Sequence, residues 1–395
     1  MAPIYLDNNA TTRTDPRVVE AMLPYFFDVY GNASSSSHAF GWAAEEAVER
    51  ARQEVADLIG AQPREIVFTS GATEACNLAL KGVADAFGDR PVHIITQATE
   101  HPAVLETLRT LIGRRVRITV LSVDNFGRVA PGDIEAALCD DTIMVAVMAA
   151  NNEIGTLQPV AEIGRLCADR AILFMTDATQ AAGKIPVDVA AWNAHLLALS
   201  AHKFHGPKGV GALYIRSRNP RVRIACQMDG GGQERGRRSG TLNVTGIVGM
   251  GAAARLCRES INSEPANLAR MRNNLVSRLV GGLGPGAKLV GHPEARLPNN
   301  ASIFIPGVEA EALLAALPHI ALSTGSACAS AAVKPSHVLG ALPDGHILGN
   351  HTIRLGVSRF TTSEEIDTAV GGILQVVQKL RAMSYGTMEV SGSRV

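Results

Sequence analysis

Short apolar runs alternate with helical stretches between residues 65 and 215. The runs are rich in Val, Ile, Leu and Ala with few polar interruptions, as is typical of strands buried on both faces of a parallel sheet. They predict strands over 65–69, 92–96, 116–123, 142–150, 172–178, 196–202 and 210–215. The alternation therefore predicts an α/β fold in which helices cover a mostly parallel sheet.

Two helices are predicted ahead of these strands. Asp15 and the proline after it have the pattern of an N-cap and a first helical position, which predicts a helix to about Phe27. A polar loop is expected over 31–41. From about Trp42, apolar residues recur at helical spacing until Gly60, so a second helix is predicted to end there.

The length of 395 residues exceeds what one hydrophobic core usually serves, so two domains are expected. Residues 15–260 contain the predicted sheet and form the expected large domain. Residues 261–395 form the expected smaller α+β domain, and residues 1–14 form an N-terminal arm that joins it.

Composition narrows the class of protein. Hydrophobic residues make up 46% and charged residues 19% of the chain, which is typical of globular domains. The 37 basic residues balance the 37 acidic ones, so no overall charge attracts nucleic acid or an anionic membrane, and neither is an expected partner. The apolar runs are too short to cross a bilayer. A small-molecule substrate is the better hypothesis.

The cysteines and the first residues indicate the compartment. The first twenty residues carry charges and no apolar stretch, so no secretory signal is expected and the cytoplasm is predicted. Six cysteines lie far apart without a C-x-x-C pair, so free thiols are expected, with neither a disulfide framework nor a metal site.

A lysine and an aspartate follow two predicted strands. Lys203 comes directly after the 196–202 run, at the carboxyl edge of the sheet, where open α/β folds bind ligands. Its amine can form a Schiff base with an aldehyde cofactor. Asp177 ends the preceding run and can pair with a protonated ring nitrogen, while Gln180 can donate to a ring oxygen. The alternatives are a surface lysine and a helix N-cap.

A phosphate site is indicated by the segment SGATE. It follows the 65–69 run and opens a helix, so the backbone N–H groups around Ala72 and Thr73 point where a phosphate would bind. Ser200 and His202 are one strand period apart, point to the same face and can complete the site. A plain helix start is the alternative.

Four further residues have candidate roles. His101 follows the 92–96 run, where an imidazole can stack on a ring or move protons, or can be structural. Asn152 lies after the 142–150 run and suits a strand cap or a ligand contact. Cys328 lies among Ser, Gly and Ala, where a thiol is accessible on a flexible loop or packed in a helix start. The guanidinium of Arg354 suits a substrate carboxylate or a surface ion pair.

Together these segments resemble the class I cysteine desulfurases, the NifS and IscS group of the fold-type I pyridoxal-phosphate enzymes in the class-V aminotransferase family. The resemblance covers nearly the whole chain. The segments that carry it occur in the family's order: YLDNNATT, SGATE, EHPAV, NNEIGT, DATQ, SAHKFHGPKG, GGGQERGRRSGT, GSAC and RFTT.

The resemblance implies a cofactor, pyridoxal 5'-phosphate. Lys203 resembles the lysine that holds its aldehyde, Asp177 the partner of the pyridine nitrogen, and Gln180 the contact to the ring oxygen. The implied phosphate ligands are Ala72, Thr73, Ser200, His202 and, from a second subunit, Thr241. A homodimer is therefore expected.

The resemblance also implies the reaction, conversion of L-cysteine to L-alanine. His101 resembles the histidine that stacks on the ring and relays protons, Asn152 a cofactor and substrate contact, and Arg354 the arginine that binds the substrate carboxylate. Cys328 resembles the cysteine that takes the sulfur as a persulfide, on a loop expected to move. The implied acceptor is a protein such as an iron-sulfur scaffold. The alternatives are a selenocysteine lyase-like enzyme and an inactive scaffold with this fold.

Overall fold

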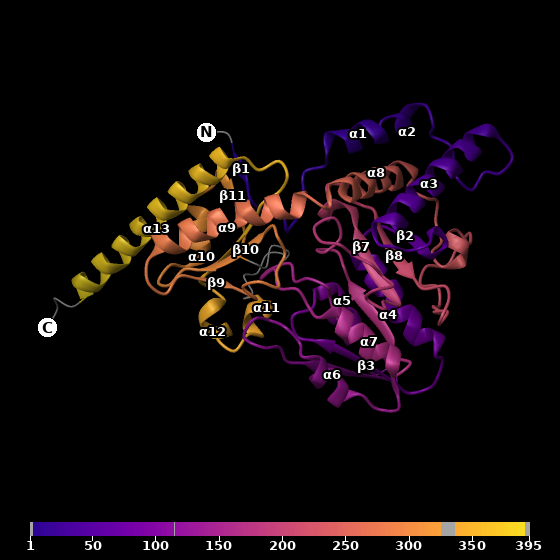
Figure 1. The fold of residues 1–395 in the computed structure, drawn as a ribbon, viewed down its shortest axis with the longest axis horizontal. Helices are drawn as coiled ribbons and strands as arrows, with labels where there is room; N and C mark the ends of the chain where they lie inside the picture. The colour runs from indigo at the N-terminus through magenta and orange to yellow at the C-terminus, as the bar shows by residue number, and fades with distance from the viewer. Residues whose placement is uncertain (1–2, 114, 325–335, 392–395) are drawn as a thin grey trace.

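A seven-stranded sheet is the centre of the larger part of the molecule (Figure 1). The computed structural model describes residues 3–113, 115–324 and 336–391, with the side chains of 384–391 left out. The strand order is β2-β8-β7-β6-β5-β3-β4. The strands are β2 (Ile66–Thr69), β3 (Val92–Gln97), β4 (Val116–Leu121), β5 (Thr142–Ala146), β6 (Leu173–Asp177), β7 (Leu196–Ser200) and β8 (Gly211–Ile215). Only the pairs with β8 are antiparallel.

Helices cover both faces of this sheet because its strands are apolar on both sides. Successive residues point to opposite faces, so Met144 joins the core beneath one helical layer and Val145 the core beneath the other. One layer contains α4 (Ala72–Ala86) and α5 (Pro102–Leu111). The other contains α3 (Ala39–Leu58), α6 (Pro131–Ala137), α7 (Val160–Asp169) and α8 (Val244–Ser260).

The C-terminal part forms a second, smaller α+β unit with its own core (Figure 1). Its antiparallel sheet has the order β12-β10-β9. The chain's N-terminus crosses to this unit, where β1 pairs in parallel with β11. The elements are β1 (Ile4–Tyr5), α9 (Glu264–Leu283), β9 (Lys288–Val290), β10 (Asn300–Phe304), α10 (Ala310–Ala315), β11 (Ile320–Ala321), α11 (His337–Gly340), α12 (Gly345–Leu348), β12 (Thr352–Gly356) and α13 (Ser363–Ser391).

The predicted fold class is confirmed, with two local differences near the N-terminus. The first predicted helix is divided into α1 (Pro16–Met22) and α2 (Pro24–Phe27), because Pro24 has no N–H for a helical hydrogen bond. The second helix begins three residues earlier than predicted, because the His38 side chain caps it by accepting the Gly41 N–H. The division at residues 15 and 261 stays a prediction.

Among the described residues, no helix combines the length and the apolar character needed to span a membrane.

Candidate active site

A pocket of about 450 Å³ lies at the carboxyl edge of the large sheet. Asp177 is the last residue of β6, and Lys203 ends the short 3-10 turn that follows β7. His101 directly precedes α5, which follows β3. Because β3, β6 and β7 run parallel to one another, their carboxyl ends share one edge and bring these three residues to one pocket. The volume lies within the usual range for small-molecule sites.

The amine of Lys203 is held by the N-terminal arm. Its Nζ donates hydrogen bonds to the carbonyl oxygens of Asn9, at 2.8 Å, and Ala10, at 2.6 Å. The arm reaches this position because its backbone also pairs with the 3-10 turn, where the Thr12 N–H donates to the carbonyl of His202. The lysine is therefore ordered at the pocket wall.

Asp177 and Gln180 belong to one turn after β6. The Asp177 Oδ1 accepts the Thr179 N–H at 2.9 Å, so the carboxylate caps a turn; the alternative of a helix N-cap is wrong, because no helix lies between β6 and β7. Gln180 Nε2 donates to the carbonyl of Asn9 at 2.9 Å, and its Oε1 accepts from Asn9 Nδ2 at 3.3 Å. Both side chains are buried and line the pocket.

His101 has a fixed tautomer. Its Nδ1 accepts the backbone N–H of Ala103 at 3.1 Å, as the side-chain cap of α5, so the neutral ring carries its proton on Nε2. Burial lowers its pKa, with a smaller contribution from Lys203, while Asp177 opposes the shift. The ring is therefore neutral at pH 7.

The amino end of α4 forms another wall of the pocket. Ala72 and Thr73 begin this helix, and its N-cap, Gly71, provides no side-chain cap, so the first N–H groups face the pocket without that partner. Ser200 and His202 line the same pocket. The His202 Nδ1 lies 3.0 Å from the Thr11 hydroxyl, and burial lowers the pKa of His202 to about 4.

The residues present fit a flat, phosphorylated aldehyde. The pocket combines an amine, a carboxylate, a helix N-terminus and hydroxyl groups. The Thr179 hydroxyl oxygen lines it, is buried, and has no hydrogen-bond partner among the described residues. A buried hydroxyl in a polar pocket is a hydrogen-bonding group that a ligand can satisfy.

Of the other predicted residues, only some are placed at this pocket. Asn152 lines it. Arg354 lies on β12, buried, where one nitrogen donates to the Asn152 carbonyl at 3.2 Å and another to Asp7 at 2.8 Å. Thr241 is exposed on the loop before α8 and is not among the described pocket residues. Cys328 lies outside the described residues.

Sequence reasoning gave no role to Lys184, which lies directly behind the pocket. Its Nζ donates to the Gln180 carbonyl at 3.2 Å and to Gln180 Oε1 at 3.4 Å. Burial lowers its pKa to about 7, and the charge of Lys203 adds to the shift. The sequence did contain a signal for its position: Lys184 lies in DATQAAGK, four residues after Gln180, so its place near the same turn could have been inferred.

The chain belongs to the aminotransferase class-V family, whose model matches residues 4–369. Within it, the relatives are cysteine desulfurases. The chain is 51% identical to "Cysteine desulfurase IscS" of Anaeromyxobacter dehalogenans over 385 residues, covering 97% of this chain and 94% of the relative. It is 47% identical to "Cysteine desulfurase" of Homo sapiens, covering 97% of this chain and 84% of the relative.

Solved structures give the same result. A "NifS-like protein" matches with a TM-score of 0.88 and 38% identity, covering 95% of this chain and 99% of the other. "SspA in complex with cysteine" matches with a TM-score of 0.79 and 32% identity, covering 91% of this chain and 100% of the other. The predicted family is confirmed.

Proposed function

We propose that this chain is a cysteine desulfurase that converts L-cysteine to L-alanine and keeps the sulfur as a persulfide on Cys328. The observation that carries the proposal is the meeting of Lys203, Asp177 and His101 in one pocket, in a chain about half identical to proteins of that name. The solved structure of SspA in complex with cysteine has the same fold and supports the choice of substrate.

The cofactor of the proposal is pyridoxal 5'-phosphate. Lys203 would bind its aldehyde carbon, Asp177 its ring nitrogen and Gln180 its ring oxygen. Ser200, His202 and the first N–H groups of α4, at Ala72 and Thr73, would hold the phosphate. When bound, the group supplies the electron sink that lets a proton leave the substrate's α-carbon, which no side chain provides.

Two residues do the proton work in this proposal. The Lys203 amine takes the proton from the α-carbon of cysteine, leaving the carbonyls of Asn9 and Ala10 that hold it in the resting site. His101, neutral at pH 7 with its Nε2 protonated, offers that N–H to the pocket side, and the ring can pass this proton on only when Nδ1 takes another in exchange. Because Nδ1 accepts the Ala103 N–H, a proton that the ring gains goes to Nδ1 and displaces that hydrogen bond.

The sulfur step uses Cys328. Its thiolate attacks the substrate sulfur, so that an S–S bond forms and the C–S bond breaks with its electron pair going to carbon. Carbon then takes a proton, giving alanine. The products, alanine and one persulfide, contain all the atoms of cysteine and one thiol, so no other oxidant or reductant is needed. The persulfide sulfur then passes to an acceptor protein, such as an iron-sulfur scaffold.

Substrate orientation is assigned to Asn152 and Arg354. The guanidinium of Arg354 already contacts the Asn152 carbonyl and Asp7. A guanidinium has five N–H donors, so it can hold Asp7 and the substrate carboxylate together.

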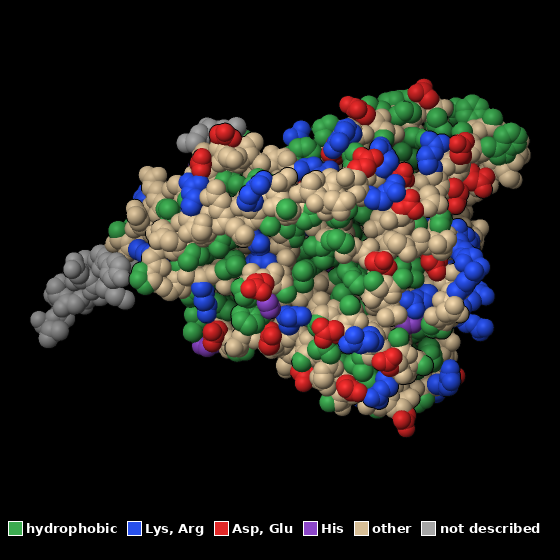
Figure 2. Space-filling view, viewed as in Figure 1, with side chains coloured by type: hydrophobic (Ala, Val, Ile, Leu, Met, Phe, Trp, Pro, Cys, Tyr) green, Lys and Arg blue, Asp and Glu red, His purple; other side chains and the backbone are tan. Residues whose placement is uncertain are grey.

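A homodimer is part of the proposal. An apolar surface over α2 and the start of α3 supports it, seen as green side chains at the upper right of Figure 2. Its exposed aromatic residues are Phe26, Phe27, Tyr30, Phe40 and Trp42. In the dimer, Thr241 would reach the phosphate of the second copy's site. The cytoplasm is the proposed compartment, because the described cysteines are free thiols.

Three variants test the proposal. Lys203→Ala is expected to lose covalent attachment of the cofactor, measured by borohydride reduction and peptide mass spectrometry. Cys328→Ala is expected to keep that attachment and lose alanine formation, with Cys226→Ala as the matched control that loses neither. His101→Gln is expected to lower kcat by about 100-fold or more. Full alanine formation by Cys328→Ala would refute the nucleophile assignment.

A further inference from the structure

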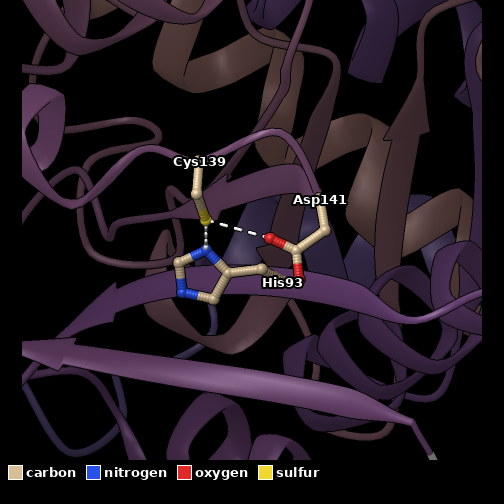
Figure 3. Close-up of side chains that lie close together, drawn as sticks. All are labelled: His93, Cys139 and Asp141. Carbon is tan, nitrogen blue, oxygen red and sulfur yellow. Dashed lines mark hydrogen bonds between the residues drawn. The ribbon is translucent and has the colours of Figure 1, made fainter.

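A second group of reactive side chains lies at the amino end of the sheet, opposite to the pocket edge. His93 is the second residue of β3, and Cys139 and Asp141 lie in the connection between α6 and β5 (Figure 3). The Cys139 Sγ is 3.1 Å from His93 Nδ1 and 3.0 Å from Asp141 Oδ1. One ligand atom from each lies within 4.8 Å of the others, so all three can reach one ion.

The histidine is fixed in the orientation a ligand needs. His93 is buried, and its Nε2 lies 2.8 Å from the Thr119 hydroxyl on β4. Its Nδ1 therefore faces the thiol and the Thr142 hydroxyl, which is also at 2.8 Å. A histidine ligand usually has its second nitrogen held by such a hydrogen bond, which sets the ring orientation before the ion binds.

A positive group already occupies the open side of the cluster. A guanidinium nitrogen of Arg117 lies 2.7 Å from Cys139 Sγ and 2.8 Å from Asp141 Oδ1. The Cys139 thiol and the Asp141 carboxylate thus already bind a cationic group. The Arg117 side chain is 53% exposed, and exposed ion pairs are weak, so a bound ion can replace it at small cost.

We propose that His93, Cys139 and Asp141 form a binding site for zinc or a divalent ion of similar ligand preference. Imidazole, thiolate and carboxylate are the ligand types of zinc sites, and a thiolate disfavours magnesium. The thiol proton leaves to solvent, and the thiolate and carboxylate together balance the charge of the ion. Water takes the fourth position on the exposed side. The ion then ties the α6–β5 connection to β3.

The spacing of cysteines along the chain does not indicate this site. The lack of a C-x-x-C pair predicts no metal site, because only one cysteine takes part here and its histidine lies 46 residues away in the chain. The strand register brings them together, since His93 is paired with Thr142 across β3 and β5.

The test uses the full-length protein with Cys328→Ser, so that the proposed sulfur-carrying thiol cannot bind the probe ion. Cobalt is titrated in as the probe, and the thiolate-to-cobalt absorption is recorded against matched variants. One bound cobalt per chain with this absorption is expected, displaced by zinc and not by magnesium. Adding Cys139→Ser is expected to abolish the absorption, whereas adding Cys226→Ser, which changes a cysteine outside the cluster, is expected to leave it intact.

A variant with the opposite expected effect separates an ion site from a hydrogen-bond network. Arg117→Gln removes the competing cation and is expected to tighten zinc binding by a small factor, because exposed ion pairs are weak. Circular dichroism checks that each variant is folded. The proposal is overturned if the absorption persists in folded Cys139→Ser, if Arg117→Gln weakens zinc binding, or if magnesium competes as well as zinc does.

Discussion

A buried glutamate beside the active pocket provides a sharp test of the electrostatics of this fold. Glu100 is 1% exposed and immediately precedes His101. Its Oε1 accepts the Met148 N–H at 2.7 Å and the Gln97 amide at 2.6 Å. Burial raises its pKa from 4.5 to about 8, those hydrogen bonds oppose the rise, and the charge of Asp177 adds to it.

The shift predicts a stability cost that depends on pH. Between pH 4.5 and about 8 the folded state keeps the Glu100 proton and the unfolded state releases it, so unfolding becomes easier as pH rises through this window. At pH 7 the cost is about 3.5 kcal/mol, from 2.5 pKa units at about 1.4 kcal/mol each. Glu100→Gln keeps the acceptor oxygen and has no charge to bury, so it lacks this cost.

The measurement is urea unfolding of wild type and Glu100→Gln at about pH 5 and about pH 8. The free energy of unfolding of the variant, relative to that of the wild type, is expected to rise by about 3.5 kcal/mol from about pH 5 to about pH 8. Glu106→Gln, an exposed carboxylate on α5, is the matched control and is expected to show no such gain. A difference between Glu100→Gln and wild type that is the same at both pH values would refute the reasoning.

Two further predictions concern buried charges. Burial lowers the pKa of Lys184 from 10.5 to about 7, so in this window the unfolded state holds more protons and wild-type stability rises with pH. Lys184→Met removes that rise. Relative to wild type, the variant is therefore expected to have a higher free energy of unfolding at about pH 7 than at about pH 10. A difference between variant and wild type that is the same at both pH values contradicts this. Arg52 and Glu234 form a buried pair with two 2.8 Å hydrogen bonds. Arg52→Met strands the carboxylate and is expected to cost about 3–5 kcal/mol in urea unfolding, and a loss below about 1 kcal/mol would count against it.

The strand ends of the site were predictable because they depend on short-range patterns. Lys203 and Asp177 follow apolar runs, and any polar residue directly after such a run lies at the carboxyl edge of a parallel sheet. The position of the α4 start at the pocket was predictable for the same reason, since SGATE joins a strand to a helix. Pro24 is a local signal for the break between α1 and α2, which the apolar pattern alone does not contain.

The contacts that hold these side chains were not predictable in the same way. The carbonyl partners of Lys203 lie 194 and 193 residues away, and Asp7 lies 347 residues from Arg354. No periodicity in the chain encodes such pairs, because they depend on how the N-terminal arm is placed against both sheets. The cluster of His93 and Cys139 was also hidden by sequence separation, because the two residues are 46 positions apart and the register of β3 and β5 brings them together.

The N-terminal arm links the two halves of the proposed chemistry. Asp7 holds Arg354 on the small sheet, while the carbonyls of Asn9 and Ala10 hold Lys203 on the large one. Asp7 and Ala10 are only three positions apart in the chain, so the arm keeps Arg354 and the Lys203 amine in a fixed relation. A substrate carboxylate at Arg354 would share that guanidinium with Asp7, and the lysine must leave its two carbonyls to act. The arm therefore connects the two sheets and holds the two charged groups that the proposed substrate would engage.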